Sequence, residues 1–205
     1  AIAALTKTQS SFPPSQFDYL YGQLAAANQA PLRQQAAAVL AQGKLTESQL
    51  LKLATEYLPQ ADAFTLPRLV PVFKGGNSEK IGVALANTLQ QSKSLDSFNE
   101  DNLKAVFASY PAPVKPAVNG LLAKLQQTQA ERLKRLQAME SRIATGDIER
   151  GRVLFYGKAI CYTCHKVGSE GGDLGPDLTS IQRDRSAHDL LEAIVYPSVS
   201  FVREY

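Results

Sequence analysis

The stretch Gly151–Leu178 reads GRVLFYGKAICYTCHKVGSEGGDLGPDL, and the interpretation of the whole chain depends on it. Cys161 and Cys164 are separated by two residues, and His165 follows the second cysteine directly. This spacing is the attachment signature of c-type haem, because two such thiols reach the two vinyl groups on one porphyrin edge while the adjacent imidazole lies under the iron. The stretch therefore predicts one covalent haem c, with His165 as the protein ligand of the iron.

Zinc and a disulfide are the alternatives to haem at this motif. The motif uses both cysteines of the chain, so no second pair exists to complete a four-cysteine zinc site. A zinc shell would have to include His165, His188 or a carboxylate, at a spacing that matches no common zinc pattern. A thioredoxin-like dithiol would need a βαβ context, which the surrounding sequence lacks. A structural disulfide between Cys161 and Cys164 remains the simplest alternative.

The tetrapeptide GPDL at 175–178 follows His165 at a distance that resembles monohaem cytochromes c. The resemblance implies that the carbonyl of Pro176 accepts the second N–H of the proximal histidine. Such a bond orients the imidazole ring and raises its basicity. The resemblance also makes Phe155, Pro176 and Leu178 candidate haem-binding residues beside the two cysteines and the histidine.

Length and composition limit the class of protein. The chain has 205 residues, of which 44% are hydrophobic, and a net charge of +3, so one large domain or two small ones can form a core. No basic stripe with interleaved aromatic residues is present, so nucleic acid is not an expected partner. No run approaches about eighteen apolar residues, so no membrane span is expected. Residues 1–7 lack the basic start and the apolar core of an intact signal peptide.

Residues 1 to about 145 repeat helical periodicity and contain no strand-like alternation of any length. The sequence Thr46–Gln49 predicts a capping box, which satisfies two unpaired N–H groups at a helix start. Asn77 and Asn99 are expected to cap two later helices. A last long helix is expected from about 114 to 143. These patterns predict an all-α fold.

The order of the helices predicts two domains. Antiparallel helix pairs with short connections are typical of HEAT-like repeats, although the loose period of roughly 35 to 45 residues leaves an irregular helical bundle as the competing interpretation. We therefore expect a helical repeat-like (HEAT-like) domain over 1–145 and a small cytochrome c haem-binding domain over 146–205. Asp147 is the expected N-cap of the helix that leads to the cysteines, and Ser186 caps a helix that Pro197 ends.

Residues 147–205 resemble the haem-binding domain of the planctomycete and verrucomicrobial type. The residues that carry this resemblance are Gly151, Phe155, Cys161, Cys164, His165, Gly171-Gly172, Gly175-Pro176-Asp177-Leu178, Leu190-Leu191-Glu192 and Pro197-Ser198. The helices before it are similar to the segment that precedes this domain in large exported proteins, many of which also carry a propeller dehydrogenase module. The resemblance therefore implies a periplasmic or otherwise exported protein.

The chain departs from that family at its end. In the family, the chain continues past the equivalent of Tyr205 into a small β-rich insert, a methionine thought to be the distal haem ligand, and a closing helix. We therefore expect an additional chain or segment to complete the haem domain. The other candidates for the distal position are His188, Met139 and an open site.

Two arginines are further candidates near the haem. Arg183 and Arg185 could pair with the haem propionates, since guanidinium groups suit carboxylates, or could be ordinary solvated loop residues.

The sequence supports three functional hypotheses. The first is an electron-transfer domain or subunit of an oxidoreductase that accepts electrons from a dehydrogenase module or a redox partner protein. The second is a five-coordinate haem domain for small-ligand binding or peroxide chemistry, which the missing distal methionine keeps open. The third is a helical interaction module in which the haem segment is secondary.

Overall fold

The computed structural model of the chain describes residues 12–197 and 199, and these are mainly α-helical, in agreement with the predicted all-α class. The expectations for residues 1–7 and Tyr205 concern positions outside the described residues. The chain divides into two compact units, Ala1–Gln129 (unit 1) and Ala130–Tyr205 (unit 2). Among the described helices, none combines the length and the apolar character that crossing a bilayer requires.

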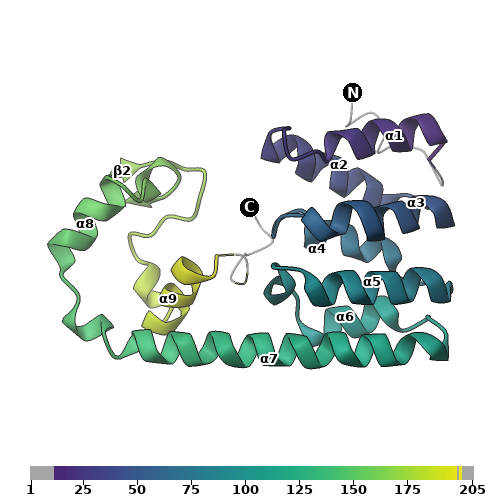
Figure 1. Cartoon of the computed structure of the whole chain (residues 1–205). Coiled ribbons are helices and arrows are strands. Elements are labelled where there is room, and N and C mark those ends of the chain that lie inside the picture. Colours follow the sequence, from purple (N-terminus) through teal and green to yellow (C-terminus); the bar gives the residue numbers. More distant parts are fainter. Residues whose placement is uncertain (1–11, 198, 200–205) are drawn as a thin grey trace. The chain divides into compact units, whose positions relative to one another are not determined.

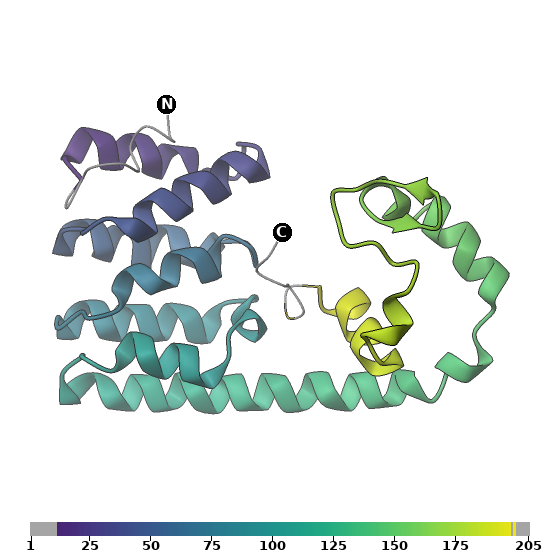
Figure 2. The same cartoon turned by 180° about the vertical axis from the view of Figure 1, so that it is seen from behind.

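Unit 1 is built from helices that stack in layers. They are α1 (Pro14–Gln23), α2 (Ala30–Gln42), α3 (Glu47–Lys52), α4 (Leu66–Leu69), α5 (Glu79–Gln91), α6 (Glu100–Phe107) and the first part of α7 (Lys115–Glu140). A π-helical turn, Leu53–Tyr57, continues α3. Figures 1 and 2 show α1 with α2, α3 with α4, and α5 with α6 in successive layers.

Polar side chains determine where several of these helices begin. Thr46 forms the predicted capping box with Gln49, and the Asn99 side chain accepts the predicted hydrogen bond from the N–H of Asn102 at 2.7 Å. The prediction for α5 is wrong by one residue, because Ser78 and not Asn77 precedes its first turn. The Ser78 hydroxyl donates to Glu47 and makes no capping bond in α5.

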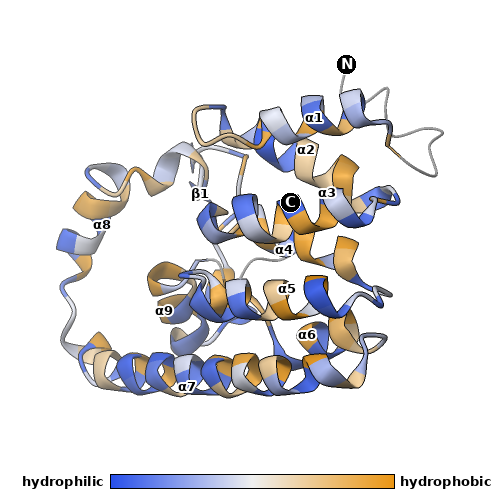
Figure 3. Ribbon diagram, turned by 45° about the vertical axis from the view of Figure 1, so that its right-hand side comes forward, coloured by the Kyte–Doolittle hydropathy of each residue, from blue (hydrophilic) through white to orange (hydrophobic). Residues whose placement is uncertain are grey.

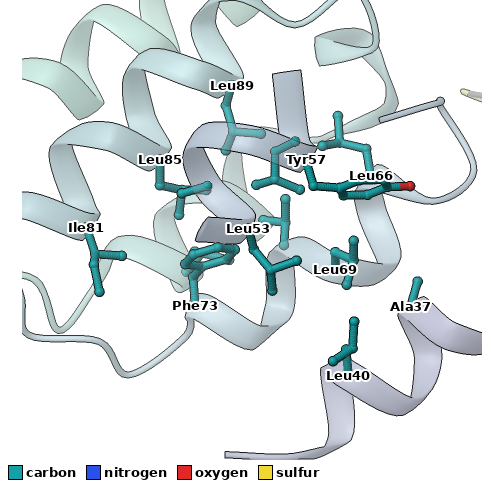
Figure 4. Packing of buried hydrophobic residues seen from close by; sticks show 14 of the residues in the cluster. Ala37, Leu40, Leu53, Tyr57, Leu66, Leu69, Phe73, Ile81, Leu85 and Leu89 are labelled. Carbon is teal, nitrogen blue, oxygen red and sulfur yellow. The ribbon is translucent and has the colours of Figure 1, made fainter. Parts of the chain in front are cut away.

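One cluster of buried apolar side chains holds unit 1 together. Figure 4 shows Phe73 near Leu53 and Leu85, and all three side chains are fully buried. Leu53 begins the π-helical turn after α3, Phe73 ends the 3-10 turn after α4, and Leu85 belongs to α5. The same cluster therefore joins successive layers. Burial of apolar surface at about 25 cal/mol per Å² is the main stabilising contribution here.

A carboxylate network fixes the turn before α4. Asp62 accepts hydrogen bonds from the backbone N–H groups of Thr65 and Phe64 at 2.8 and 3.0 Å, and it pairs with Arg33 at 3.1 Å. Burial alone would raise the pKa of Asp62, but the hydrogen bonds from Thr65, Arg33 and Phe64 outweigh it and lower the pKa. The carboxylate therefore stays ionised and holds the turn in one conformation.

Unit 2 has shorter elements. It contains the C-terminal part of α7, α8 (Ile148–Tyr156), the hairpin strands β1 (Lys166–Val167) and β2 (Glu170–Gly171), and α9 (Ala187–Val195), with 3-10 turns at Cys161–Thr163 and Ile181–Arg183. The predicted caps Asp147 and Ser186 accept bonds from the third residue of α8 and α9. The hairpin lies where the sequence predicts only a polar loop, and it turns at Gly168 with φ +64°.

The boundary between the two compact units lies inside α7, between Gln129 and Ala130. Arg132 and Glu140, on the C-terminal part of α7, pair with Glu192 and His188 of α9, so this part of the helix belongs with unit 2. The segment 146–205 remains the predicted extent of the haem-binding domain.

Candidate functional site

The cysteine motif forms a tight turn after α8. The N–H groups of Cys164 and His165 both donate to the carbonyl of Cys161, at 3.2 and 3.0 Å. Ile160, directly before the turn, has φ +47°, a left-handed conformation that is costly for a β-branched residue and is often found at functional sites. Cys161 is half-buried, Cys164 is exposed, and both are free thiols. The turn therefore presents two thiols and one imidazole from five consecutive residues.

A long-range hydrogen bond orients the imidazole. His165 Nδ1 lies 2.9 Å from the carbonyl oxygen of Pro176, 11 residues further along the chain. A carbonyl oxygen can only accept, so Nδ1 carries the proton and donates it. This bond selects the tautomer whose Nε2 has a free lone pair. The imidazole is thus prepared to bind a metal through Nε2, as the resemblance to monohaem cytochromes c implies for this histidine and this proline.

Two backbone bonds hold the glycine-rich loop against the turn. The N–H of Gly175 donates to the Cys164 carbonyl at 2.7 Å, and the N–H of Gly172 donates to the Tyr162 carbonyl at 2.8 Å. A Cβ added at Gly175 would lie 2.7 Å from Cε1 and 2.8 Å from Nδ1 of His165, and one at Gly172 would collide with the Thr163 carbonyl. Both positions therefore need glycine, because the loop backbone lies directly against the motif.

We expect Gly175→Ala to displace the His165 ring and to lower the amount of covalent haem per purified chain by about tenfold, since a displacement of about 1 Å at a reacting group can cost a factor of ten or more. Haem content is measured by absorbance against protein concentration. Gly151→Ala is the matched control, because no described atom lies within 4 Å of its added Cβ and alanine is the better helix former in α8. Equal haem contents in the two variants would contradict the importance of this contact.

The chain after Pro176 is tied to the hairpin. The N–H of Leu178 donates to the Lys166 carbonyl at 2.8 Å, and the N–H of Gly168 donates to the hydroxyl of Thr179, also at 2.8 Å. Thr179 in turn donates to Asp177, and the side-chain and backbone bonds from Thr179 lower the pKa of Asp177. These bonds fix the position of the Pro176 carbonyl that His165 uses.

The other predicted contact residues lie around the same turn. Phe155 is half-buried at the end of α8, with its ring centroid 5.1 Å from that of Tyr156, and Tyr156 lies 5.9 Å from Tyr162 of the motif. Leu178 is half-buried after the loop. An open pocket of about 470 Å³ lies between α8 and the hairpin, and Tyr156 forms part of its wall.

The segment around the motif has no packed core of its own. From residue 141 to 197, no side chain in the described part of the chain is fully buried. Ile160 is 62% exposed and Leu174 is 79% exposed, so large apolar side chains next to the motif face outward. Burial within this segment is limited, and a large apolar group held at the motif would add contact surface. The two thiols, the oriented imidazole and the exposed apolar side chains therefore fit a haem.

The described residues lack a side-chain cluster that suits zinc. In residues 12–197 and 199, no group of three or more His, Cys, Asp or Glu side chains converges to hold a metal ion. A structural zinc site needs four protein ligands. Haem needs only His165 and the two thiols from this part of the chain.

The remaining candidates lie in other parts of unit 2. His188 donates through Nδ1 to Glu140 of α7, and Met139 is the exposed neighbour of Glu140 in α7. Arg183 belongs to the 3-10 turn Ile181–Arg183, and Arg185 directly precedes the cap of α9. The hydrogen bonds described above link His165, Cys164 and Cys161 with the loop and Pro176, and they involve none of these four residues.

Sequence reasoning missed three features that shape the site. It did not assign a role to Gly172, Gly175 or the strained Ile160, although the run GGDLG at 171–175 was a visible signal for close backbone contact. Comparison of the chain with protein-family models, with curated proteins and with solved structures gives no significant match. The functional assignment therefore depends on the site itself.

Proposed function

We propose that this protein is a c-type cytochrome, in which one haem is attached through Cys161 and Cys164 and His165 is the proximal ligand. The observation that carries this proposal is the 2.9 Å bond from His165 Nδ1 to the Pro176 carbonyl, which leaves Nε2 free to bind iron. Thioether formation is a net addition and requires no oxidant. Cys161 and Cys164 would hold the haem, because each thiol S–H would add across one vinyl C=C bond, with one C–S and one C–H bond formed.

Within this class we propose an electron-transfer domain or subunit that accepts single electrons from a dehydrogenase module or a redox partner protein. Bound haem supplies reversible one-electron chemistry at iron. The chain's own residues hold the imidazole through Pro176, keep the loop tight at Gly175, and surround the attachment turn with apolar side chains. These features would influence the reduction potential of the haem through the basicity of the histidine ligand and the burial of the haem.

The proposal extends to the architecture and the location of the protein. The layered helix pairs of unit 1 support a HEAT-like repeat domain before the haem-binding domain. Haem c attachment implies an exported protein, in keeping with the family resemblance.

Intact-mass analysis combined with absorption spectroscopy of the purified protein tests the proposed function. We expect the mass of one covalent haem per chain and, after reduction, the sharp α band of a low-spin haem. A chain mass without haem would overturn the cytochrome assignment. A high-spin ferric spectrum with ready carbon monoxide binding after reduction would instead support the five-coordinate, ligand-binding alternative.

A further inference from the structure

Unit 2 contains a contact that the haem site does not explain. Figures 1 and 2 show α9 alongside the C-terminal part of α7, and Figure 3 colours α9 as one of the more hydrophobic elements of unit 2. Leu136 of α7 is 0% exposed, and it is the sole fully buried side chain among the described residues of this unit. The contact therefore forms the only apolar core of the described part of unit 2.

One ion pair and one hydrogen bond flank this leucine. Arg132 Nε lies 3.3 Å from Glu192 Oε1, and His188 Nδ1 donates to Glu140 Oε1. The three α7 positions, 132, 136 and 140, are spaced by four residues and so lie along one face of the helix. The partners on α9 run in the opposite order, so α9 lies antiparallel to α7, and Leu136 lies between the two pairs on the α7 face that carries them.

The charged side chains are partly withdrawn from water. The Arg132 and Glu192 side chains are 13% and 20% exposed, which makes their attraction less screened than that of an ordinary surface pair. The bond from His188 to Glu140 is made through an N–H that both the neutral and the protonated imidazole can carry. The ion pair and the hydrogen bond therefore both favour this position of α9 on α7.

We propose that Leu136 and the pairs Arg132–Glu192 and His188–Glu140 form an electrostatic latch that closes the chain loop bearing the cysteine motif. His188 and Glu140 are 48 positions apart, and residues 161–165 lie between them. Docking of α9 brings the two ends of this loop together, at an entropic cost that the latch contacts offset. This inference concerns the protein chain alone and does not depend on haem attachment.

Hydrogen exchange of the α9 amides, measured by mass spectrometry on the full chain, tests the latch. We expect Leu136→Ala to raise the exchange rate in 187–195 by at least about tenfold, since it removes a buried leucine side chain. Leu133→Ala is the matched control, because Leu133 is 45% exposed on the same helix, and its effect should stay within about twofold. Equal effects of the two substitutions would overturn the proposal.

Charge exchange provides a second test that does not disturb the buried leucine. Arg132→Glu and Glu192→Arg should each raise exchange in α9 by about three- to tenfold, because each places like charges together. The double variant should return exchange to within about twofold of wild type, and added salt should raise wild-type exchange. Failure of the double variant to restore protection, with an unchanged far-UV circular dichroism spectrum, would show that the pair does not hold α9.

Discussion

The double variant Cys161→Ala plus Cys164→Ala is expected to carry no covalent haem. Both thioether bonds require these sulfur atoms, and the chain contains no other cysteine that could replace them. The two thiols are free and accessible at the attachment turn, so the substitution removes the reactive groups without removing a buried side chain. Intact mass under denaturing conditions, together with a haem stain after electrophoresis, measures the loss.

Tyr162→Phe is the matched control for this experiment. Tyr162 lies between the two cysteines in the same exposed turn, and phenylalanine keeps its ring contact with Tyr156. We expect this variant to retain about one haem per chain. Covalent haem in the double variant would overturn the assignment of the two thiols. Loss of haem in both variants would indicate that the turn conformation, and not the sulfur atoms, was disturbed.

Phe73→Ala is expected to lower the free energy of unfolding by about 3–5 kcal/mol, the range for removal of a buried phenylalanine ring. Phe73 is 0% exposed and lies in the cluster that joins α3, α4 and α5. Its backbone carbonyl also accepts a 3.1 Å hydrogen bond from the hydroxyl of Tyr110, and alanine retains that carbonyl. The loss therefore reports mainly on the cavity left by the ring. Urea unfolding followed by far-UV circular dichroism measures it.

Phe64→Ala is the matched control, because it removes the same aromatic ring from an exposed position. Phe64 precedes α4 in the same unit, and its side chain is 43% exposed. We expect a loss of less than about 1 kcal/mol, as is usual for exposed positions. Similar losses for the two variants would show that Phe73 is not part of the main core of unit 1. A change in the urea slope would instead report an altered unfolded state or a transition that is not two-state.

The local features of this protein could be predicted from the sequence. Thr46, Asn99, Asp147 and Ser186 were recognised as caps because each acts on N–H groups two or three residues away. Helical periodicity likewise depends on neighbours within two turns. The exception is α5, which begins after Ser78 and not after Asn77, while the Ser78 hydroxyl bonds to Glu47, a residue 31 positions earlier, and forms no cap. Haem attachment at the cysteine motif stays a prediction from the sequence, with a geometry that fits it.

Contacts between distant residues were decided only by the tertiary structure. The resemblance implied the bond from His165 to Pro176, but the need for glycine at 175 emerged only from its approach to the imidazole ring. The docking of α9 on α7 depends on partners far apart in the sequence, such as His188 and Glu140, which are 48 positions apart. No periodicity or cap encodes such a pairing, because it arises from the folded path of the whole intervening chain and from the burial and charge that this path brings together.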